Sequence, residues 1–466
     1  MKQNFLYKII VIITSLLLCY TFYRSEIYYK GELRAYYNYI YTTLILILFS
    51  LIIYNFLNKK VKKYINIFFF SALFTLYLFE LYQLKFVPIT KLDIENSILK
   101  KKVKLLKKNE NKIYDTRNEY DAYIDLKKKY KNIVPAIGPV NNINNINILP
   151  LGGIANSKTL YCNENGYYAI YQSDRYGFNN PDREWDEEEI EYLLVGDSFV
   201  HGACVNRPND ISSVLRAISD KTVINLGYGG NGPLLTFASL REYLKPNTKN
   251  VVWFFYEGND LKNLHKEINS SILKKYLTNL NYSQNLPYKQ SRINHLLEKK
   301  IQKKINFLKS HKNMIKVKKY SENTIKISQF IKLFRTRKLL SKTFANKPIP
   351  KKDNKKFDHW DTNKKVNDTF ISILKETNIL VKKNNSNFYF VYLPANRRYF
   401  DHTFNDNLRT KIKSITNELD IIFIDIHEEV FEKVKNPKIY FPFGFSGHYN
   451  KLGYKKIAER IYLLIK

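Results

Sequence analysis

The chain has 466 residues, 45% of them hydrophobic, and its 76 Lys and Arg against 42 Asp and Glu give a formal net charge of +34. This length allows a membrane region together with one large or two ordinary domains. Three cysteines, Cys19, Cys162 and Cys204, exclude a disulfide framework. Because Cys19 lies in an apolar segment, one Cys162–Cys204 bridge is the most that could form in an oxidising compartment.

Residues 1–90 predict a membrane region with three helices. They contain three runs without charge, Ile9–Tyr23, Ala35–Asn58 and Tyr64–Phe79. The middle run can span a bilayer core, which needs about 20 residues. The outer two are shorter, but snorkelling of Lys8 and Lys85 can extend them. We expect transmembrane segments at about 6–23, 36–58 and 64–84.

Lysines set the expected orientation of these helices. The loop between the second and third runs contains four of them, Lys59, Lys60, Lys62 and Lys63. The positive-inside rule places this loop and the N-terminus in the cytoplasm, and everything after about residue 90 outside it. We therefore expect a multi-pass protein of the cell inner membrane with a periplasmic or other extracytoplasmic domain. A cleaved signal peptide is an alternative for the first run, although Leu16–Cys19 lacks the small residues of a cleavage site.

Residues 91–190 predict a helical linker followed by a small β lead-in. The stretch Lys91–Lys131 is rich in Lys and Glu and is typical of helix, and Asn141–Asn147 is an Asn/Ile loop. Aromatic, β-like sequence follows in Lys158–Asn180. The acidic run Asp186–Glu189 closes the region as a solvated linker.

Residues 191–466 alternate between strand and helix patterns, as parallel βαβ units do. Strand-like runs are Tyr192–Val195, Thr222–Leu226, Val251–Tyr256, Phe388–Leu393 and Ile421–Ile426. Helical runs are Asp210–Ser219, Leu235–Leu244, Val366–Lys382, Leu408–Glu418 and Leu452–Ile465. This pattern predicts a three-layer α/β/α domain with a five-stranded parallel sheet.

The interval from Leu261 to about Trp360 is too long for a connection in such a fold, so it predicts a helical insertion. It holds 26 Lys and Arg but only 5 Asp and Glu. Such a region could bind nucleic acid, anionic lipid or an acidic glycan. We favour a solvated helical surface with at most membrane-surface attraction. Nucleic acid is not expected as a partner, because the predicted topology places the region outside the cytoplasm.

Four groups of polar residues fall at strand ends, where chemistry gathers in open α/β sheets. They are Ser198 after the first strand, the glycine-rich turn Asn225–Gly232, Glu257–Asp260, and Gly447–Asn450. A serine, glycine N–H groups, an asparagine amide and a histidine are the parts that acyl transfer requires. Each also has a structural alternative, since Ser198 could cap a helix, Asn259 could cap a turn and His448 could be a packing residue.

In order, these groups resemble the SGNH/GDSL hydrolase family. The matching blocks are Gly196-Asp197-Ser198-Phe199, Gly230 five residues after Asn225, Gly258-Asn259-Asp260, and His448 followed by Asn450 and Gly453. The resemblance covers about residues 170 to 466 without the insertion, and it implies a flavodoxin-like α/β/α fold. No cofactor is expected. No metal is expected either, because the eight histidines include no pair at ligand spacing such as His-x₃-His.

The resemblance also implies roles for individual residues. Ser198 would be the nucleophile and His448 the general base. The Ser198 and Gly230 N–H groups and the Asn259 amide would form the oxyanion hole. Supporting roles would fall to Asp197, Asp260 and Asn450.

Two positions depart from the family pattern. Phe445 stands three residues before His448, where the family has an aspartate that orients the imidazole. Glu257 stands two residues before Asn259 in place of a glycine. We therefore expect a Ser–His dyad whose Nδ1–H is held by a backbone carbonyl, with reduced or lost activity as the other outcome.

These features predict a membrane-anchored serine esterase or O-acyltransferase. Its substrates would be acyl esters, most simply acetyl, of envelope or extracellular glycans, as in polysaccharide modification. The first alternative is a catalytically impaired scaffold that binds glycan or an assembly partner. The second is an esterase that acts on phospholipid. Expected partners are the bilayer, an acyl-ester glycan or lipid substrate, and polysaccharide-assembly proteins.

Overall fold

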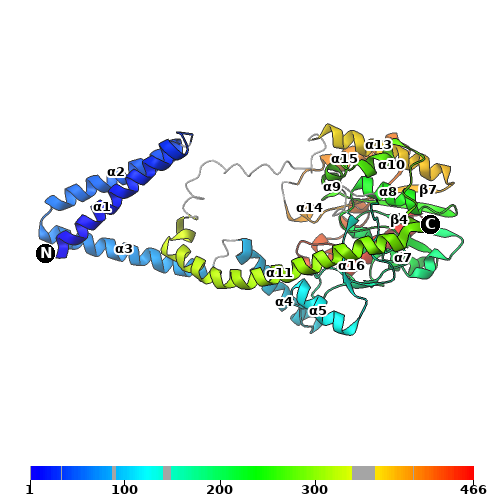
Figure 1. The fold of residues 1–466 in the computed structure, drawn as a ribbon, viewed down its shortest axis with the longest axis horizontal. Coiled ribbons are helices and arrows are strands. Elements are labelled where there is room, and N and C mark those ends of the chain that lie inside the picture. Colours follow the sequence, from blue (N-terminus) through cyan, green and yellow to red (C-terminus); the bar gives the residue numbers. More distant parts are fainter. Residues whose placement is uncertain are drawn as a thin grey trace. The chain divides into compact units, whose positions relative to one another are not determined.

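The computed structural model describes residues 2–32, 34–86, 91–139, 148–337, 339, 363–401 and 404–465. The expected Asn/Ile loop at 141–147 and the last part of the expected insertion lie outside these residues. The chain divides into two compact units (Figure 1). The first comprises Met1–Ile89 with Asn323–Asn346, and the second comprises Thr90–Glu322 with Lys347–Lys466.

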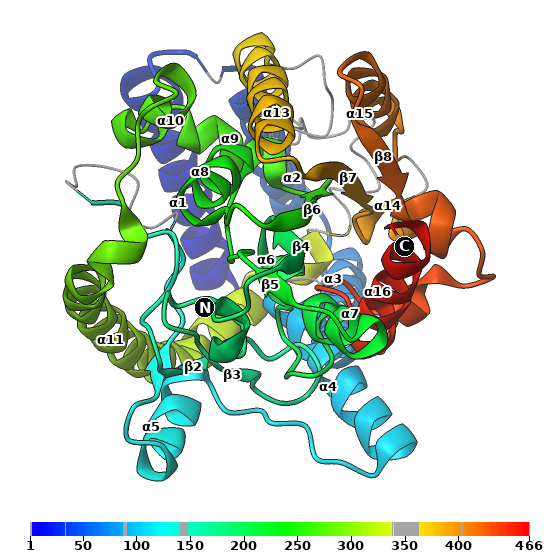
Figure 2. The ribbon, with the colours of Figure 1, turned by 90° about the vertical axis from the view of Figure 1, so that its right-hand side faces the viewer.

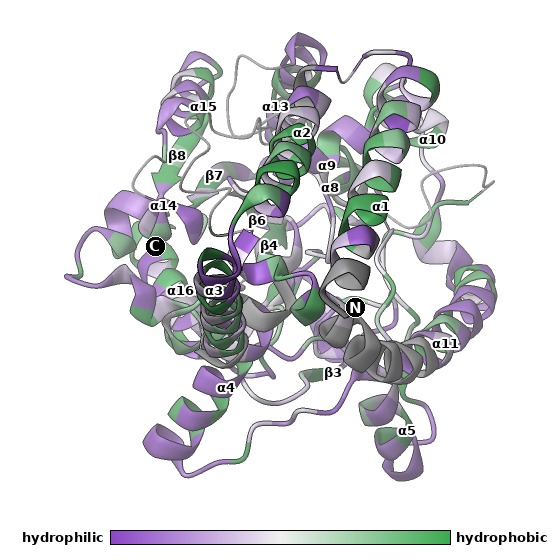
Figure 3. Cartoon of the chain, turned by 90° about the vertical axis from the view of Figure 1, so that its left-hand side faces the viewer, coloured by the Kyte–Doolittle hydropathy of each residue, from purple (hydrophilic) through white to green (hydrophobic). Residues whose placement is uncertain are grey.

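Three apolar helices build most of the first unit. They are α1 (Lys2–Phe22), which continues as a π-helical turn (Tyr23–Tyr28), α2 (Arg34–Phe56) and α3 (Lys59–Phe86). Stretches of all three are coloured as hydrophobic in Figure 3. Each is long and apolar enough to cross a membrane, over Ile10–Tyr28, Tyr37–Phe56 and Lys59–Gln83. The predicted set of three such helices is confirmed.

A buried carboxylate on α3 binds a segment that the sequence assigns to the insertion. Glu80 is fully buried and accepts hydrogen bonds from the backbone N–H groups of Arg335 (2.9 Å) and Thr336 (2.7 Å). The Tyr77 hydroxyl donates to the carbonyl of Ile331, the last residue of α11 (Gln290–Ile331). The end of the insertion's long helix therefore packs on α3, which the charge pattern does not indicate.

The second unit contains the predicted five-stranded sheet. Its strands are β4 (Ile190–Val195), β5 (Val223–Asn225), β6 (Thr248–Tyr256), β7 (Asn387–Leu393) and β8 (Ile422–Asp425). All neighbours pair in parallel, in the order β5-β4-β6-β7-β8. Numbered along the chain this order is 2-1-3-4-5, which is the flavodoxin-like arrangement. The predicted fold class is confirmed.

Helices cover both faces of this sheet (Figure 2). On one face lie α8 (Pro233–Tyr243), α13 (Lys364–Lys383) and α15 (Asn407–Glu418), and on the other lie α7 (Ile211–Ser219) and α16 (Lys451–Ile465). Successive side chains of a strand point to opposite faces, so Leu193 enters the first core and Leu194 the second. Both faces are buried, which is why the strands form continuous apolar runs in the sequence.

The lead-in forms a second, three-stranded sheet. It consists of β1 (Val134–Pro135), β2 (Lys158–Leu160) and β3 (Ile170–Gln172), and the described helices α4 (Lys91–Glu110) and α5 (Glu119–Lys129) precede it. Within this sheet β2 pairs in parallel with β1 and antiparallel with β3. The loop of residues 161–169 that joins β2 to β3 carries part of the site described below.

Glu267, the last residue of α9 (Asp260–Glu267), closes the N-terminus of α8. Its carboxylate is fully buried and accepts hydrogen bonds from the N–H groups of Gly232 (2.5 Å) and Leu234 (2.9 Å). Gly232 is the N-cap residue and has no side chain to do this. A carboxylate from a neighbouring helix therefore supplies the acceptor that the helix start needs.

We expect Glu267→Ala to lower the free energy of unfolding by about 3 kcal/mol, because it leaves buried N–H donors without a partner. The matched control is Glu298→Ala, whose side chain is exposed on α11 and should change stability by less than about 0.5 kcal/mol. Urea unfolding of the full chain in detergent, followed by tryptophan fluorescence, measures both. Equal losses for the two variants would contradict the capping role.

Candidate active site

A tight turn presents Ser198 at the carboxyl end of β4. A Cβ on Gly196 would lie 2.7 Å from the Phe254 carbonyl oxygen, so the turn needs a glycine. Asp197 then caps the short helix α6 (Ser198–His201) by accepting the Phe199 N–H at 2.9 Å. The structure thus gives the capping role to Asp197 rather than to Ser198, which occupies the first position of the helix.

His448 meets this serine from the last loop of the chain. Its Nε2 lies 2.9 Å from the Ser198 Oγ. The loop continues into α16 through Asn450, whose side chain donates to the carbonyls of Ile439 (2.7 Å) and Phe441 (3.1 Å) and accepts the Gly453 N–H (3.0 Å). Asn450 therefore fixes the loop that carries the histidine through these three contacts.

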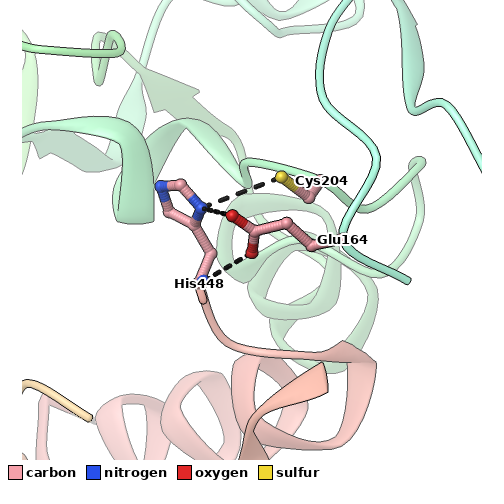
Figure 4. Close-up of side chains that lie close together, drawn as sticks. All are labelled: Glu164, Cys204 and His448. Carbon is pink, nitrogen blue, oxygen red and sulfur yellow. Dashed lines mark hydrogen bonds and ion pairs between the residues drawn. The ribbon is translucent and has the colours of Figure 1, made fainter. Parts of the chain in front are cut away.

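Glu164 supplies the carboxylate that the sequence analysis does not find. Its Oε1 lies 3.0 Å from His448 Nδ1, and its Oε2 accepts the His448 backbone N–H at 2.6 Å (Figure 4). A Cβ on Gly447 would lie 2.5 Å from the same oxygen, so the glycine before the histidine leaves room for the carboxylate. The expectation of a dyad held by a backbone carbonyl is wrong. The contact is a carboxylate from the loop between β2 and β3.

No motif in the sequence marks Glu164. It lies in the polar turn Asn163-Glu164-Asn165, 34 residues before Ser198 and 284 before His448. The family pattern directs attention to position 445, which is a phenylalanine. The one available signal is that Glu164 stands two residues after Cys162, the cysteine able to pair with Cys204 near the serine.

Glu164 and His448 shift each other's pKa: His448 lowers that of Glu164, and Glu164 raises that of His448. Burial favours the neutral form of Glu164, but the hydrogen bonds and charge of His448 outweigh it and lower the Glu164 pKa. Burial also opposes charge on His448, but the hydrogen bond and charge of Glu164, with a contribution from Asp197, raise the His448 pKa. With Glu164 ionised, Nδ1–H donates to it and Nε2 is left to accept the Ser198 proton.

A cavity of about 290 Å³ opens in front of the serine and the histidine. Ser198, Gly230 and His448 line it together with Tyr161 and Tyr228. Three of the residues that the sequence assigns to the site are thus brought together. Backbone N–H groups, such as those of Ser198 and Gly230, are donors that can stabilise an oxyanion.

The oxyanion role expected of the Asn259 amide stays a prediction. The Asn259 side chain hydrogen-bonds toward the Asp197 carboxylate and favours the charged form of that group. Its Oδ1 is buried and has no partner among the described residues.

Two buried carboxyl groups, Asp197 and Asp260, lie behind the serine. Burial raises the pKa of Asp197 to about 6. Burial, followed by the charge of Asp197, raises the pKa of Asp260 well above its usual range. The Asp260 Oδ2 accepts the Tyr256 N–H at 3.0 Å. Ionisation of Asp260 is therefore disfavoured beside Asp197, because two like charges in a buried site oppose each other.

Glu257, the second departure from the family pattern, has a structural role. Its side chain is only 1% exposed and accepts hydrogen bonds from the Tyr392 hydroxyl, the Ala395 N–H (2.6 Å) and the Arg398 guanidinium. It therefore ties the end of β6 to the chain that leaves β7. A buried, bidentate ion pair of this kind anchors a loop rather than providing a base.

Cys162 and Cys204, the one pair that the sequence leaves able to form a bridge without requiring it, are joined by a disulfide with an S–S distance of 2.03 Å. Cys204 Sγ also lies 3.7 Å from His448 Nδ1, so Glu164, Cys204 and His448 form a cluster of ligand-type atoms (Figure 4). A disulfide sulfur is not the thiolate that binds metals. The His448 nitrogen of the cluster is also bonded to Glu164. These residues fit a hydrogen-bonded triad beside a disulfide better than a metal site.

No protein-family model matches the chain, and no curated protein matches it. Three similar solved structures are a protein assigned to the G-D-S-L lipolytic family from Desulfitobacterium hafniense (13% identity, TM-score 0.32), the acetyl xylan esterase AlAXEase (11%, 0.31) and a G-D-S-L lipolytic family member from Veillonella parvula (12%, 0.28). Each match covers 59% of this chain and 99%, 100% and 97% of the other, respectively.

We expect Glu164→Gln to slow fluorophosphonate labelling of Ser198 by about 10²-fold or more, because the imidazolium loses its carboxylate. Since Glu164 raises the His448 pKa, its loss should also move the low-pH limb of the rate profile downward. Labelling of the full chain in detergent from pH 5 to 9 measures both effects. The control is Glu298→Gln, on an exposed surface. A profile that does not move would show that Glu164 does not act on His448.

Proposed function

We propose that the chain is a membrane-anchored serine esterase or O-acyltransferase of the SGNH type. The observation that supports this most directly is the relay Ser198 Oγ–His448 Nε2 (2.9 Å) and His448 Nδ1–Glu164 Oε1 (3.0 Å). A nucleophile, a base and an orienting acid at hydrogen-bond distance are the parts of a serine hydrolase triad. Their placement at the carboxyl edge of a parallel sheet agrees with where such folds bind substrate.

The mechanism follows from these contacts. Ser198 attacks the ester carbonyl while His448 accepts its proton, and Glu164 stabilises the imidazolium that forms. The Ser198 and Gly230 N–H groups hold the oxyanion. Collapse of the tetrahedral intermediate releases the alcohol with a proton from His448 and leaves an acyl-Ser198 ester. Water or a sugar hydroxyl then attacks that ester, with His448 as base, to give hydrolysis or transfer respectively.

The shape of the cavity favours a small acyl group on a sugar. A volume of about 290 Å³ suits an acetyl ester with part of its sugar. Tyr161 and Tyr228 provide aromatic surface in its wall. We propose acetyl esters of envelope or extracellular glycans as the substrate class, and polysaccharide-assembly proteins as the partners of such an enzyme.

Two features support a site outside the cytoplasm. Three N-terminal helices are apolar enough to span a membrane, and the lysines between the second and third favour a cytoplasmic loop there. A disulfide beside the site is typical of oxidising compartments. We therefore propose an inner-membrane location with the N-terminus in the cytoplasm and the catalytic domain in the periplasm.

The scaffold alternative loses its main support. It depends on a missing carboxylate at position 445, and Glu164 provides a carboxylate from another segment. No contact of the described residues favours phospholipid over a glycan ester. The esterase or acyltransferase is therefore the function that we retain.

We expect Ser198→Ala and His448→Ala each to lower the rate of aryl acetate hydrolysis by at least about 10³-fold, because each removes a member of one catalytic unit. The control is Ser414→Ala, on the exposed side of α15, which should keep the wild-type rate. Full-length protein in detergent is assayed, with circular dichroism to verify folding. A Ser198→Ala protein with the wild-type rate would eliminate the mechanism.

A wild-type protein that labels at Ser198 but does not hydrolyse the ester would be a transferase that excludes water. An acetylated oligosaccharide donor and an unacetylated oligosaccharide acceptor then test transfer, read as acetylated acceptor by mass spectrometry. Absence of labelling, hydrolysis and transfer in folded protein would reject the proposed function.

A further inference from the structure

Glu164 reaches His448 from outside the sheet that positions the serine and the histidine. Its loop, residues 161–169, belongs to a small sheet whose strands β2 and β3 have three residues each. The Glu164 side chain is 26% exposed and charged, so apolar packing does not fix its position. The position of the carboxylate therefore depends on what holds this loop against the domain.

The only covalent link among the described contacts of this loop is the Cys162–Cys204 disulfide. Cys162 stands two residues before Glu164, and Cys204 stands six residues after Ser198. The Cys204 end is firmly placed, because the residue is fully buried and the Ala203 N–H before it donates to the Ser198 carbonyl at 3.0 Å. The bridge thus joins the acid's loop to the segment that carries the nucleophile.

Hydrogen bonds also hold the loop, but each is of ordinary strength. Asn165 donates to the Cys204 carbonyl at 2.9 Å, and the Gly166 carbonyl accepts the Asp115 N–H at 2.8 Å. Partly exposed hydrogen bonds of this kind can break and re-form as the loop moves, whereas a covalent bond cannot. The disulfide is therefore the restraint that keeps the loop of Glu164 attached to the domain until it is reduced.

The disulfide also contacts the base directly. Cys204 Sγ lies 3.7 Å from His448 Nδ1, the nitrogen that bonds to Glu164. Cys162 lines the cavity in front of Ser198. Opening the bridge would free the loop and change the surroundings of the His448–Glu164 contact at the same time.

We propose that the Cys162–Cys204 disulfide is the positioning element that holds Glu164 on His448, so that the catalytic rate depends on the redox state of this pair. The proposal rests on the proposed function. One thiolate of a dithiol would attack the Sγ of Cys162, a partly exposed residue, so that a mixed disulfide forms, the Cys162–Cys204 bond breaks and Cys204 leaves as a thiol. The second thiol of the reagent then attacks the mixed disulfide and releases Cys162 as a thiol. In total, two electrons and two protons pass to the cysteines and the reagent becomes a disulfide. Cys204 is fully buried and is not the point of attack.

The test is a cycle of variants in the full chain, in detergent and in a Cys19→Ser background, because Cys19 is a free, exposed cysteine. The four proteins are the parent, Cys162→Ala with Cys204→Ala, Glu164→Gln, and the combination of all three changes. Aryl acetate hydrolysis and fluorophosphonate labelling of Ser198 are followed from pH 5 to 9. Parent protein reduced with dithiothreitol and then reoxidised provides the same comparison without substitution, in case the cysteine variant does not fold.

If the bridge acts through Glu164, losing it slows the reaction by about 10-fold or more and moves the low-pH limb downward, as Glu164→Gln does. In the Glu164→Gln protein, losing the disulfide should lower the rate less than about twofold. Reoxidation of the reduced parent protein should restore its original rate. Equal costs with and without Glu164, or a rate in folded protein that does not respond to reduction, would overturn the proposal.

Failure of the proposed function has a different signature in this experiment. In that case the oxidised parent itself shows neither turnover nor labelling. A parent protein whose rate is the same with the disulfide oxidised or reduced would reject the positioning role and leave the proposed function standing.

Discussion

The hydrogen bond between Glu164 and His448 is the constraint on which the site depends. A histidine that must accept a proton at Nε2 needs its other nitrogen held by an acceptor, and a carboxylate also stabilises the imidazolium. Glu164 meets both needs through a 3.0 Å contact to Nδ1 and a 2.6 Å contact to the His448 backbone N–H. The second contact fixes the loop as well as the ring, so one carboxylate sets both the place and the tautomer of the base.

The fold and two of the three triad members follow from local sequence. The five strands are predictable because parallel strands buried on both faces are continuous apolar runs that end in polar turns. Ser198 begins the short helix that follows β4, and His448 lies in the loop that leads into α16. The sequence limits disulfide formation to Cys162 with Cys204 but does not require the bridge, which the structure contains.

Other features depend on tertiary contacts that have no periodicity. Glu164 is an ordinary polar-turn residue until the loop of residues 161–169 folds onto the domain. Likewise, the segment after α11 carries the charge pattern of the insertion, yet the N–H groups of Arg335 and Thr336 bind the buried carboxylate of Glu80. In both cases, spacing along the chain does not reveal the contact that decides the role of the residue.

The departure at Phe445 shows why geometry is the better criterion for this site. The requirement at Nδ1 is a carboxylate oxygen at hydrogen-bond distance, and any segment that reaches the ring can supply it. Under the proposed function, an acid that comes from the lead-in rather than from the histidine's own loop makes the small sheet part of the active site. It also requires Gly447 to leave space and a tether to hold the new segment, and both are present. If Glu164 acts on His448 from a separate segment, the basicity of His448 depends on how tightly that segment is packed. Any change that loosens the loop of residues 161–169 then also lowers the basicity of His448.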